Sequence, residues 1–128
     1  MILFFDRSMG TRIPKALRFL KPPVEIRFHD EEFKKDEHDD IWLPKVGRDG
    51  WIVISQDYSF HTNASELEAI KQYQIGCFYL WGATAPKWET FRILARAFDR
   101  VLSKAEHTPK PFIFRVHRTS QLTSIELF

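Results

Sequence analysis

The strongest strand candidate in the chain is the stretch WIVISQD, residues 51–57. Its first four residues are aromatic or β-branched, and they show no alternation of polar and apolar side chains. A continuous apolar run of this kind is typical of a strand in a parallel sheet that helices cover on both faces. The stretch therefore predicts an α/β fold, and it puts the carboxylate of Asp57 directly after a buried strand.

On both sides of this stretch, short apolar runs alternate with segments in which apolar residues recur at helical spacing. We expect strands at residues 2–5, 24–28, 51–55, 77–80 and 112–116, and an edge strand within 122–128. Helices are expected at 13–20 and 64–73, after Pro86, and as a short helix capped by Asp39 or Asp40. The acidic segment 29–38 is expected to be a solvated loop. Strands that alternate with helices predict an open parallel α/β sheet.

The composition is that of a soluble chain of 128 residues, with 44% apolar and 28% charged residues and a net charge of +2. This length fits one domain, so we expect residues 1–128 to fold as a single unit. The single cysteine, Cys77, excludes an intrachain disulfide and a CxxC metal site. No apolar run approaches the ~20 residues of a membrane span, so we expect a cytoplasmic protein without membrane contact.

Charged and aromatic residues outside the strand ends are interpreted structurally. Residues 30–40 contain seven acidic and two basic side chains, whereas residues 84–118 contain eight basic and three acidic ones, so the two segments have opposite fields. The basic stripe of the long helix is interpreted as a solvated face; it consists of Arg92, Arg96, Arg100 and Lys104. The histidines without ligand spacing are interpreted as surface residues; they are His29, His38, His107 and His117. The tryptophans are interpreted as core or interface residues; they are Trp42, Trp51, Trp81 and Trp88.

Carboxylates follow the predicted strands where a functional site is expected, because the crevice of an open parallel sheet lies beyond the carboxyl ends of its strands. Asp6 follows the first strand, Asp57 follows the third, and the loop after the second leads to Asp39 and Asp40. Crowded carboxylates repel one another unless a cation lies among them, and oxygen ligands suit Mg²⁺ or Mn²⁺. The alternative interpretation gives each aspartate an ordinary turn or helix-cap role.

These motifs, in this order, resemble the PIN-like domains of VapC-type toxins. They are Asp6-Arg7 after an apolar run, an acidic stretch leading into Asp39-Asp40-Ile41-Trp42-Leu43, residues 51–57, and Pro111-Phe112-Ile113-Phe114-Arg115-Val116. The resemblance covers nearly the whole chain. It implies a three-layer PIN-like fold, with a central parallel β-sheet flanked by α-helices, and a metal-dependent endoribonuclease that is the toxin of a toxin–antitoxin pair.

The resemblance also implies roles for single residues. Asp6, Asp39 and Asp57 match the metal-binding and catalytic carboxylates for Mg²⁺ or Mn²⁺, and Asp40 is one position from Asp39 and can replace it. The implied reaction is hydrolysis of an RNA phosphodiester by a metal-activated water. The family often has a fourth acidic residue just beyond the third strand, and residues 58–63 contain none.

Substrate and partner contacts are expected around these carboxylates. An acidic site needs basic residues beside it to hold RNA, and Arg7 and Arg12 are the nearest candidates. Asn63 is a further candidate for metal or substrate, with a turn-and-cap role as the alternative. A small antitoxin or a second copy in a homodimer is expected to contact exposed aromatic residues such as Trp81, Phe33 or Phe128.

Two other functions stay open. The domain can keep a PIN-like fold as a binding or regulatory module without cleaving RNA, since the fourth carboxylate is missing. A receiver-type phosphoacceptor domain also has acidic residues after its first and third strands. That class has adjacent carboxylates after the first strand and a lysine closing the fifth, whereas here Arg7 follows Asp6 and the last core strand contains Arg115.

Overall fold

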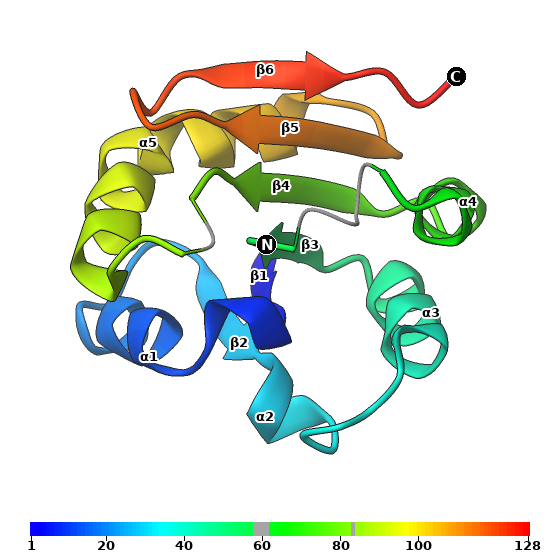
Figure 1. Cartoon of the computed structure of the whole chain (residues 1–128), viewed down its shortest axis with the longest axis horizontal. Helices are drawn as coiled ribbons and strands as arrows, with labels where there is room; N and C mark the ends of the chain where they lie inside the picture. The colour runs from blue at the N-terminus through cyan, green and yellow to red at the C-terminus, as the bar shows by residue number, and fades with distance from the viewer. Residues whose placement is uncertain (58–61, 83) are drawn as a thin grey trace.

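The computed structural model describes residues 1–57, 62–82 and 84–128, which form one sheet with helices on both faces (Figure 1). The strands are β1 (Ile2–Phe5), β2 (Glu25–Phe28), β3 (Ile52–Ser55), β4 (Gly76–Leu80), β5 (Phe112–Val116) and β6 (Leu122–Ile125). The helices are the 3-10 turn η1 (Arg7–Met9), α1 (Arg12–Phe19), α2 (His29–Glu32), α3 (Asp39–Asp49), α4 (Ala64–Gln72) and α5 (Lys87–His107).

The six-stranded sheet has the order β2-β1-β3-β4-β5-β6. Neighbouring strands from β2 to β5 pair in parallel, and β6 pairs antiparallel with β5, so its arrow points the opposite way in Figure 1. The predicted α/β fold with a central parallel sheet is therefore confirmed, and β6 is the predicted edge strand. Because β1, β3, β4 and β5 are parallel, their carboxyl ends meet at one edge of the sheet.

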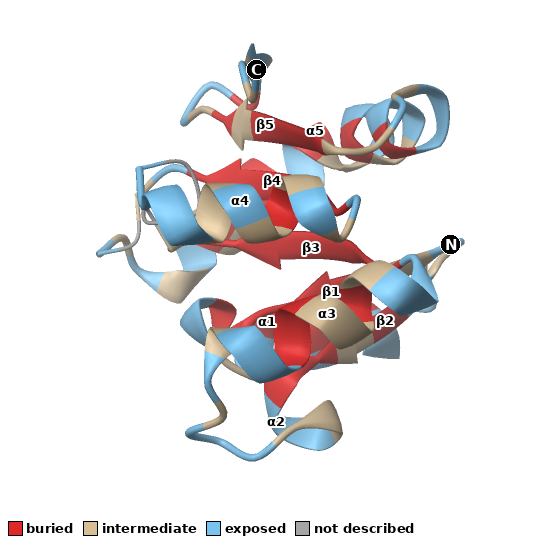
Figure 2. Cartoon of the chain, turned by 90° about the vertical axis from the view of Figure 1, so that its right-hand side faces the viewer, coloured by how far each residue is buried: buried red, intermediate tan, exposed pale blue. Residues whose placement is uncertain are grey.

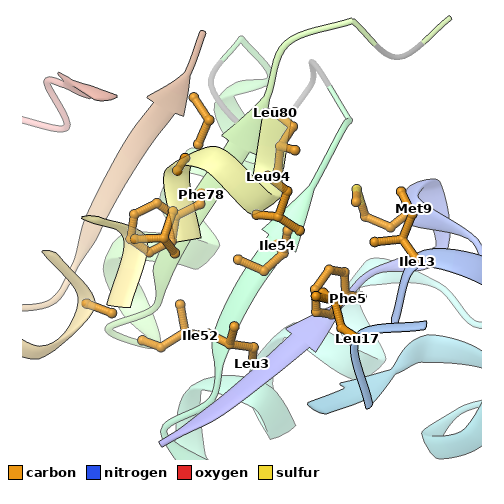
Figure 3. Close-up of a cluster of buried hydrophobic side chains, with 14 of the residues drawn as sticks. Leu3, Phe5, Met9, Ile13, Leu17, Ile52, Ile54, Phe78, Leu80 and Leu94 are labelled. Carbon is orange, nitrogen blue, oxygen red and sulfur yellow. The ribbon is translucent and has the colours of Figure 1, made fainter. Parts of the chain in front are cut away.

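Successive residues of a strand point to opposite faces of the sheet, and in β1, β3, β4 and β5 they enter two separate cores. Leu3 and Phe5 of β1 pack with residues of α1 and α5, whereas Phe4 packs with residues of α3 and α4. Figure 3 shows part of the first core, where the labelled side chains of β1, β3 and β4 meet those of α1 and α5. Figure 2 shows buried strands behind helices whose outer surfaces are exposed, which explains why the inner strands β1, β3 and β4 are apolar on both faces.

The acidic segment 29–38 differs from its prediction as a solvated loop. Residues 29–32 form α2, and His29, predicted to be a surface residue, is only 1% exposed. Its ring lies 5.6 Å from that of Phe33, which is half-buried against Phe4 at 5.8 Å rather than exposed for a partner. Contacts with aromatic residues far along the chain outweigh the local excess of charge, and a charge pattern alone does not reveal such contacts.

Two smaller differences concern helix ends and tryptophans. His38 is the N-cap residue of α3, so Asp39 and Asp40 lie inside the first turn of this helix. Their negative charges interact favourably there with the helix dipole. Trp88 is 74% exposed on α5, so of the two predicted roles, core or interface, only the interface role stays open for it. In the described residues, no helix is both long and apolar enough to cross a lipid bilayer.

Candidate active site

Asp6 lies at the carboxyl end of β1 and is 3% exposed. It is the N-cap residue of η1, where its Oδ1 atom accepts hydrogen bonds from the backbone N–H of Ser8 at 3.1 Å and from the Ser8 hydroxyl at 2.5 Å. Its Oδ2 atom accepts a 2.6 Å hydrogen bond from the hydroxyl of Ser55, the last residue of β3. Both carboxylate oxygens are thus held in a fixed orientation.

The two serines also bind the backbone that leads to Asp57. The Ser55 hydroxyl oxygen accepts from the backbone N–H of Asp57 at 2.9 Å, and the Ser8 hydroxyl oxygen accepts from the N–H of Gln56 at 2.9 Å. The ends of β1 and β3 are thereby joined through side chains. Neither serine was predicted as a site residue, although each is two residues from an aspartate near a strand end, as Asp6-Arg7-Ser8 and Ser55-Gln56-Asp57.

Burial dominates the electrostatics of Asp6. The pKa of Asp6 is raised from 3.8 to about 6, mainly because burial removes solvent from its carboxylate; the hydrogen bonds from Ser55 and Ser8 oppose the rise, and the negative charge of Asp57 adds to it. Asp57 itself is half-buried. A carboxylate that is ionised at neutral pH despite burial beside another carboxylate is a suitable ligand for a cation.

Asp39 and Asp40 occupy the first turn of α3. The Oδ1 atom of Asp39 accepts a 2.9 Å hydrogen bond from the indole N–H of Trp42, and Asp40 is exposed. Within the described ranges, no three His, Cys, Asp or Glu side chains form a group that could hold a metal ion. Of the predicted aspartates, Asp6 and Asp57 interact through their charges. A metal-binding role for Asp39 or Asp40 stays a prediction.

The predicted substrate residues lie at the surface. Arg7 is exposed and donates to the backbone carbonyl of Lys35 at 3.2 Å, and Arg12 is exposed at the start of α1. Asn63 caps α4, because its side-chain oxygen accepts from the N–H groups of Ser65 and Glu66 at 2.9 and 3.4 Å. Asn63 thus has the cap role that was expected as the alternative to metal or substrate binding. Residues 58–61, which belong to the stretch without a fourth carboxylate, lie outside the described residues.

Glu66, the first carboxylate after Asp57, lies half-buried in the first turn of α4. Its charge contributes to the electrostatics of the buried Cys77 thiol, whose pKa burial raises well above the usual value. The negative charges of Asp6, Glu66 and Asp57 raise that pKa further. The fold thus brings Glu66 within electrostatic range of the Cys77 thiol, on which the charges of Asp6 and Asp57 also act.

The oxygen atoms at this edge suit a hard divalent cation. Mg²⁺ in proteins is commonly held by one or two carboxylates while water and substrate phosphates complete its octahedron. Asp6 and Asp57 supply two carboxylates, and the buried charge of Asp6 lacks a cationic partner among the described residues. Such a pair can bind a cation and present it to a phosphate.

Comparison with known proteins adds one finding. A family model for a PIN-like domain matches residues 1–82, a range that contains β1 to β4 and each of the predicted metal-binding aspartates. The comparisons with curated proteins and with solved structures found no match.

Proposed function

Because the chain belongs to the PIN-like domain family, we propose that it is a metal-dependent endoribonuclease whose active site is centred on Asp6 and Asp57. PIN-like domains are generally nucleases. Hydrolysis of an RNA phosphodiester is the reaction that we propose for this member. The receiver-type alternative has no comparable support, since the family match includes both of the strand ends on which that alternative depended.

The observation that carries the proposal is the environment of Asp6. Its carboxylate is 3% exposed, has its pKa raised to about 6, and interacts with the charge of Asp57. A purely structural hydrogen-bond acceptor at this position needs no charge, and a buried charge beside another of the same sign costs free energy. Titratable groups with such shifts concentrate at functional sites.

We propose that Asp6 and Asp57 hold Mg²⁺ or Mn²⁺, with Asp39 or Asp40 as a further ligand or water-orienting group. When bound, such a cation activates a water molecule and neutralises charge on the phosphate in the transition state. Ser8 and Ser55 keep the Asp6 carboxylate oriented through their hydrogen bonds. Arg7 and Arg12, both exposed on the segment of the chain that follows β1, attract the RNA backbone.

The toxin role of a toxin–antitoxin pair is the finer form of this proposal. A small antitoxin, or a second copy in a homodimer, would cover apolar side chains that the chain leaves in water. Phe19 is 85% exposed on α1 and Trp88 is 74% exposed on α5, so each offers apolar contact area. We expect such a pair to act in the cytoplasm.

A non-cleaving PIN-like binding module is the second candidate function. It is favoured by the absence, within the described residues, of a group of three metal-binding side chains. It differs from the nuclease proposal in one measurable property, which is turnover of RNA.

The decisive experiment is cleavage of an end-labelled single-stranded RNA by the purified chain with Mg²⁺, with Mn²⁺ and with a chelator. Wild type is compared with Asp6→Asn and Asp57→Asn, and with Asp99→Asn, an exposed aspartate of α5, as the matched control. We expect metal-dependent cleavage that falls at least about 100-fold in the two site variants and is unchanged in the control. Equal inertness of all folded proteins with every metal would reject the nuclease in favour of the binding module.

A further inference from the structure

One row of side chains crosses the sheet at its carboxyl edge, and we call it the carboxyl-edge row. It begins with Asp6, which is bonded to Ser55. The strand register then pairs Ser55 with Tyr79, and Tyr79 with Arg115. The row therefore extends from the candidate active site on β1 and β3 to an arginine on β5.

All members of the carboxyl-edge row lie on the same face of the sheet. Each is two residues after a side chain of the core beneath α3 and α4, and residues two apart in a strand share a face. The preceding core residues are Phe4, Val53, Cys77 and Ile113. Three strand spacings separate β1 from β5, so the row is about 14 Å long.

A basic hollow opens at the β5 end of this row. Its volume is about 320 Å³, similar to that of small ligand sites. It is lined by Trp81, Arg115, His117, Arg118, Thr119, Gln121 and Thr123. The lining residues include two arginines and no carboxylate, so the hollow favours an anion.

Arg115 is poised for a ligand that the described residues do not supply. Its guanidinium lies 4.3 Å from the centre of the Trp81 ring, which holds its plane in place. Its Nε atom is buried without a hydrogen-bond acceptor, and it has no ion pair in the part of the chain that the structure describes. An unsatisfied buried donor costs free energy, and a planar guanidinium matches the oxygens of a phosphate.

Hydrogen bonds tie this hollow to the candidate active site. The side-chain amide of Gln56, next to Asp57, donates to the carbonyl of Gly82 at 3.1 Å. The backbone N–H of Trp81 donates to the carbonyl of Val116 on β5 at 3.0 Å. The spacing between the hollow and the aspartate pair is thus set by the fold.

We propose that the basic hollow binds a backbone phosphate of the single-stranded RNA substrate, away from the phosphate cleaved at Asp6 and Asp57; this inference rests on the proposed function. Arg115 and Arg118 contact the phosphate, and the 36% exposed ring of Trp81 packs against the neighbouring nucleotide. Phosphates of a stacked strand are about 3.4 Å apart along its axis, so the row corresponds to roughly four nucleotides.

The test measures RNA binding separately from cleavage. A fluorescently labelled single-stranded RNA of about ten nucleotides is titrated with the full chain in the presence of a chelator, and polarisation gives Kd at several salt concentrations. The variants are Arg115→Gln and Arg118→Gln. Arg96→Gln, which removes the same charge from an exposed position of α5 outside the hollow, is the control.

We expect Arg115→Gln and Arg118→Gln to raise Kd about 5- to 50-fold. Each should also reduce the slope of log K against log salt by about 0.7, the value for one lost phosphate contact with a single strand. Arg96→Gln should change Kd less than about twofold. Arg118 lies exposed on the turn between β5 and β6, so its variant tests the inference even if Arg115→Gln impairs folding.

The outcomes separate this inference from the proposed function. If both arginine variants bind RNA like wild type, or if wild type binds no RNA in chelator, the basic hollow is not an RNA site. The cleavage assay with Asp57→Asn decides the nuclease activity independently of either result. Weakened binding in the hollow variants of a chain that cleaves nothing would support the hollow and reject the nuclease.

Discussion

The Ser55 hydroxyl donates a 2.6 Å hydrogen bond to the Asp6 carboxylate, and both side chains are buried. This bond joins two residues that are 49 positions apart in the sequence. The same hydroxyl oxygen accepts from the backbone N–H of Asp57. Ser55 therefore sets the relative position of the two aspartates that we propose as the centre of the active site.

Ser55→Ala should lower both activity and stability. The change leaves one oxygen of Asp6 and the N–H of Asp57 without their partner, which costs about 1–3 kcal/mol of the free energy of unfolding. It also removes a bond that lowers the pKa of Asp6, so the acidic limb of the pH–rate profile should move to higher pH. Urea unfolding and the profile measure the two effects. Ser124→Ala, on the edge strand β6, serves as control, and equal behaviour of the two variants would contradict this role.

Asp6 should give the protein a characteristic dependence of stability on pH. Its pKa is about 6 in the folded chain and 3.8 in the reference state, so folding favours the protonated form. The contribution is fully present below about pH 4 and is lost as pH rises through 6, a decrease of about 3 kcal/mol in the free energy of unfolding. In Asp6→Asn this part of the pH dependence should disappear. Urea unfolding from pH 4 to 8 without divalent cations measures it, and parallel curves for the two proteins would refute it.

Divalent cations should stabilise the folded chain at neutral pH. A cation that binds between Asp6 and Asp57 offsets their repulsion, and binding to the folded state alone raises Tm with concentration. We expect Mg²⁺ or Mn²⁺ to raise the Tm of wild type by several degrees at about 100 times Kd. The increase should be lost in Asp57→Asn and retained in Asp99→Asn. A similar increase in all three proteins would indicate binding elsewhere.

His29→Phe should stabilise the protein. Neither ring nitrogen of His29 makes a hydrogen bond within the described residues, and its Nδ1 atom lies 3.5 Å from the Oδ1 atom of Asp30. Phenylalanine keeps the contacts with Phe33 and Trp42 and removes the two buried polar atoms. We expect a gain of about 1 kcal/mol in urea unfolding, and no gain for His107→Phe on the exposed end of α5. A loss in His29→Phe would mean that the imidazole has a polar partner in solution.

Most of the strands and helices follow from local patterns in the sequence. The residues 51–55 predicted as a strand contain β3, and the predicted strand at 112–116 coincides with β5. Except for Ser55 and Arg115 near their carboxyl ends, these runs are apolar because both faces of the sheet are covered, so they are recognisable without knowledge of their neighbours. The segment at α2 shows where local patterns fail, because its aromatic partners Phe4 and Trp42 lie outside it.

The sequence by itself determined that Asp6 and Asp57 each follow a buried strand within two residues, because an apolar run and the carboxylate after it are close together in the chain. Only the tertiary structure decided which side chains lie beside them. The bond from Ser55 to Asp6 and the row that leads to Arg115 depend on strand order and register. Register is set by the packing of both cores together, and a shift of one residue would turn every one of these side chains to the opposite face.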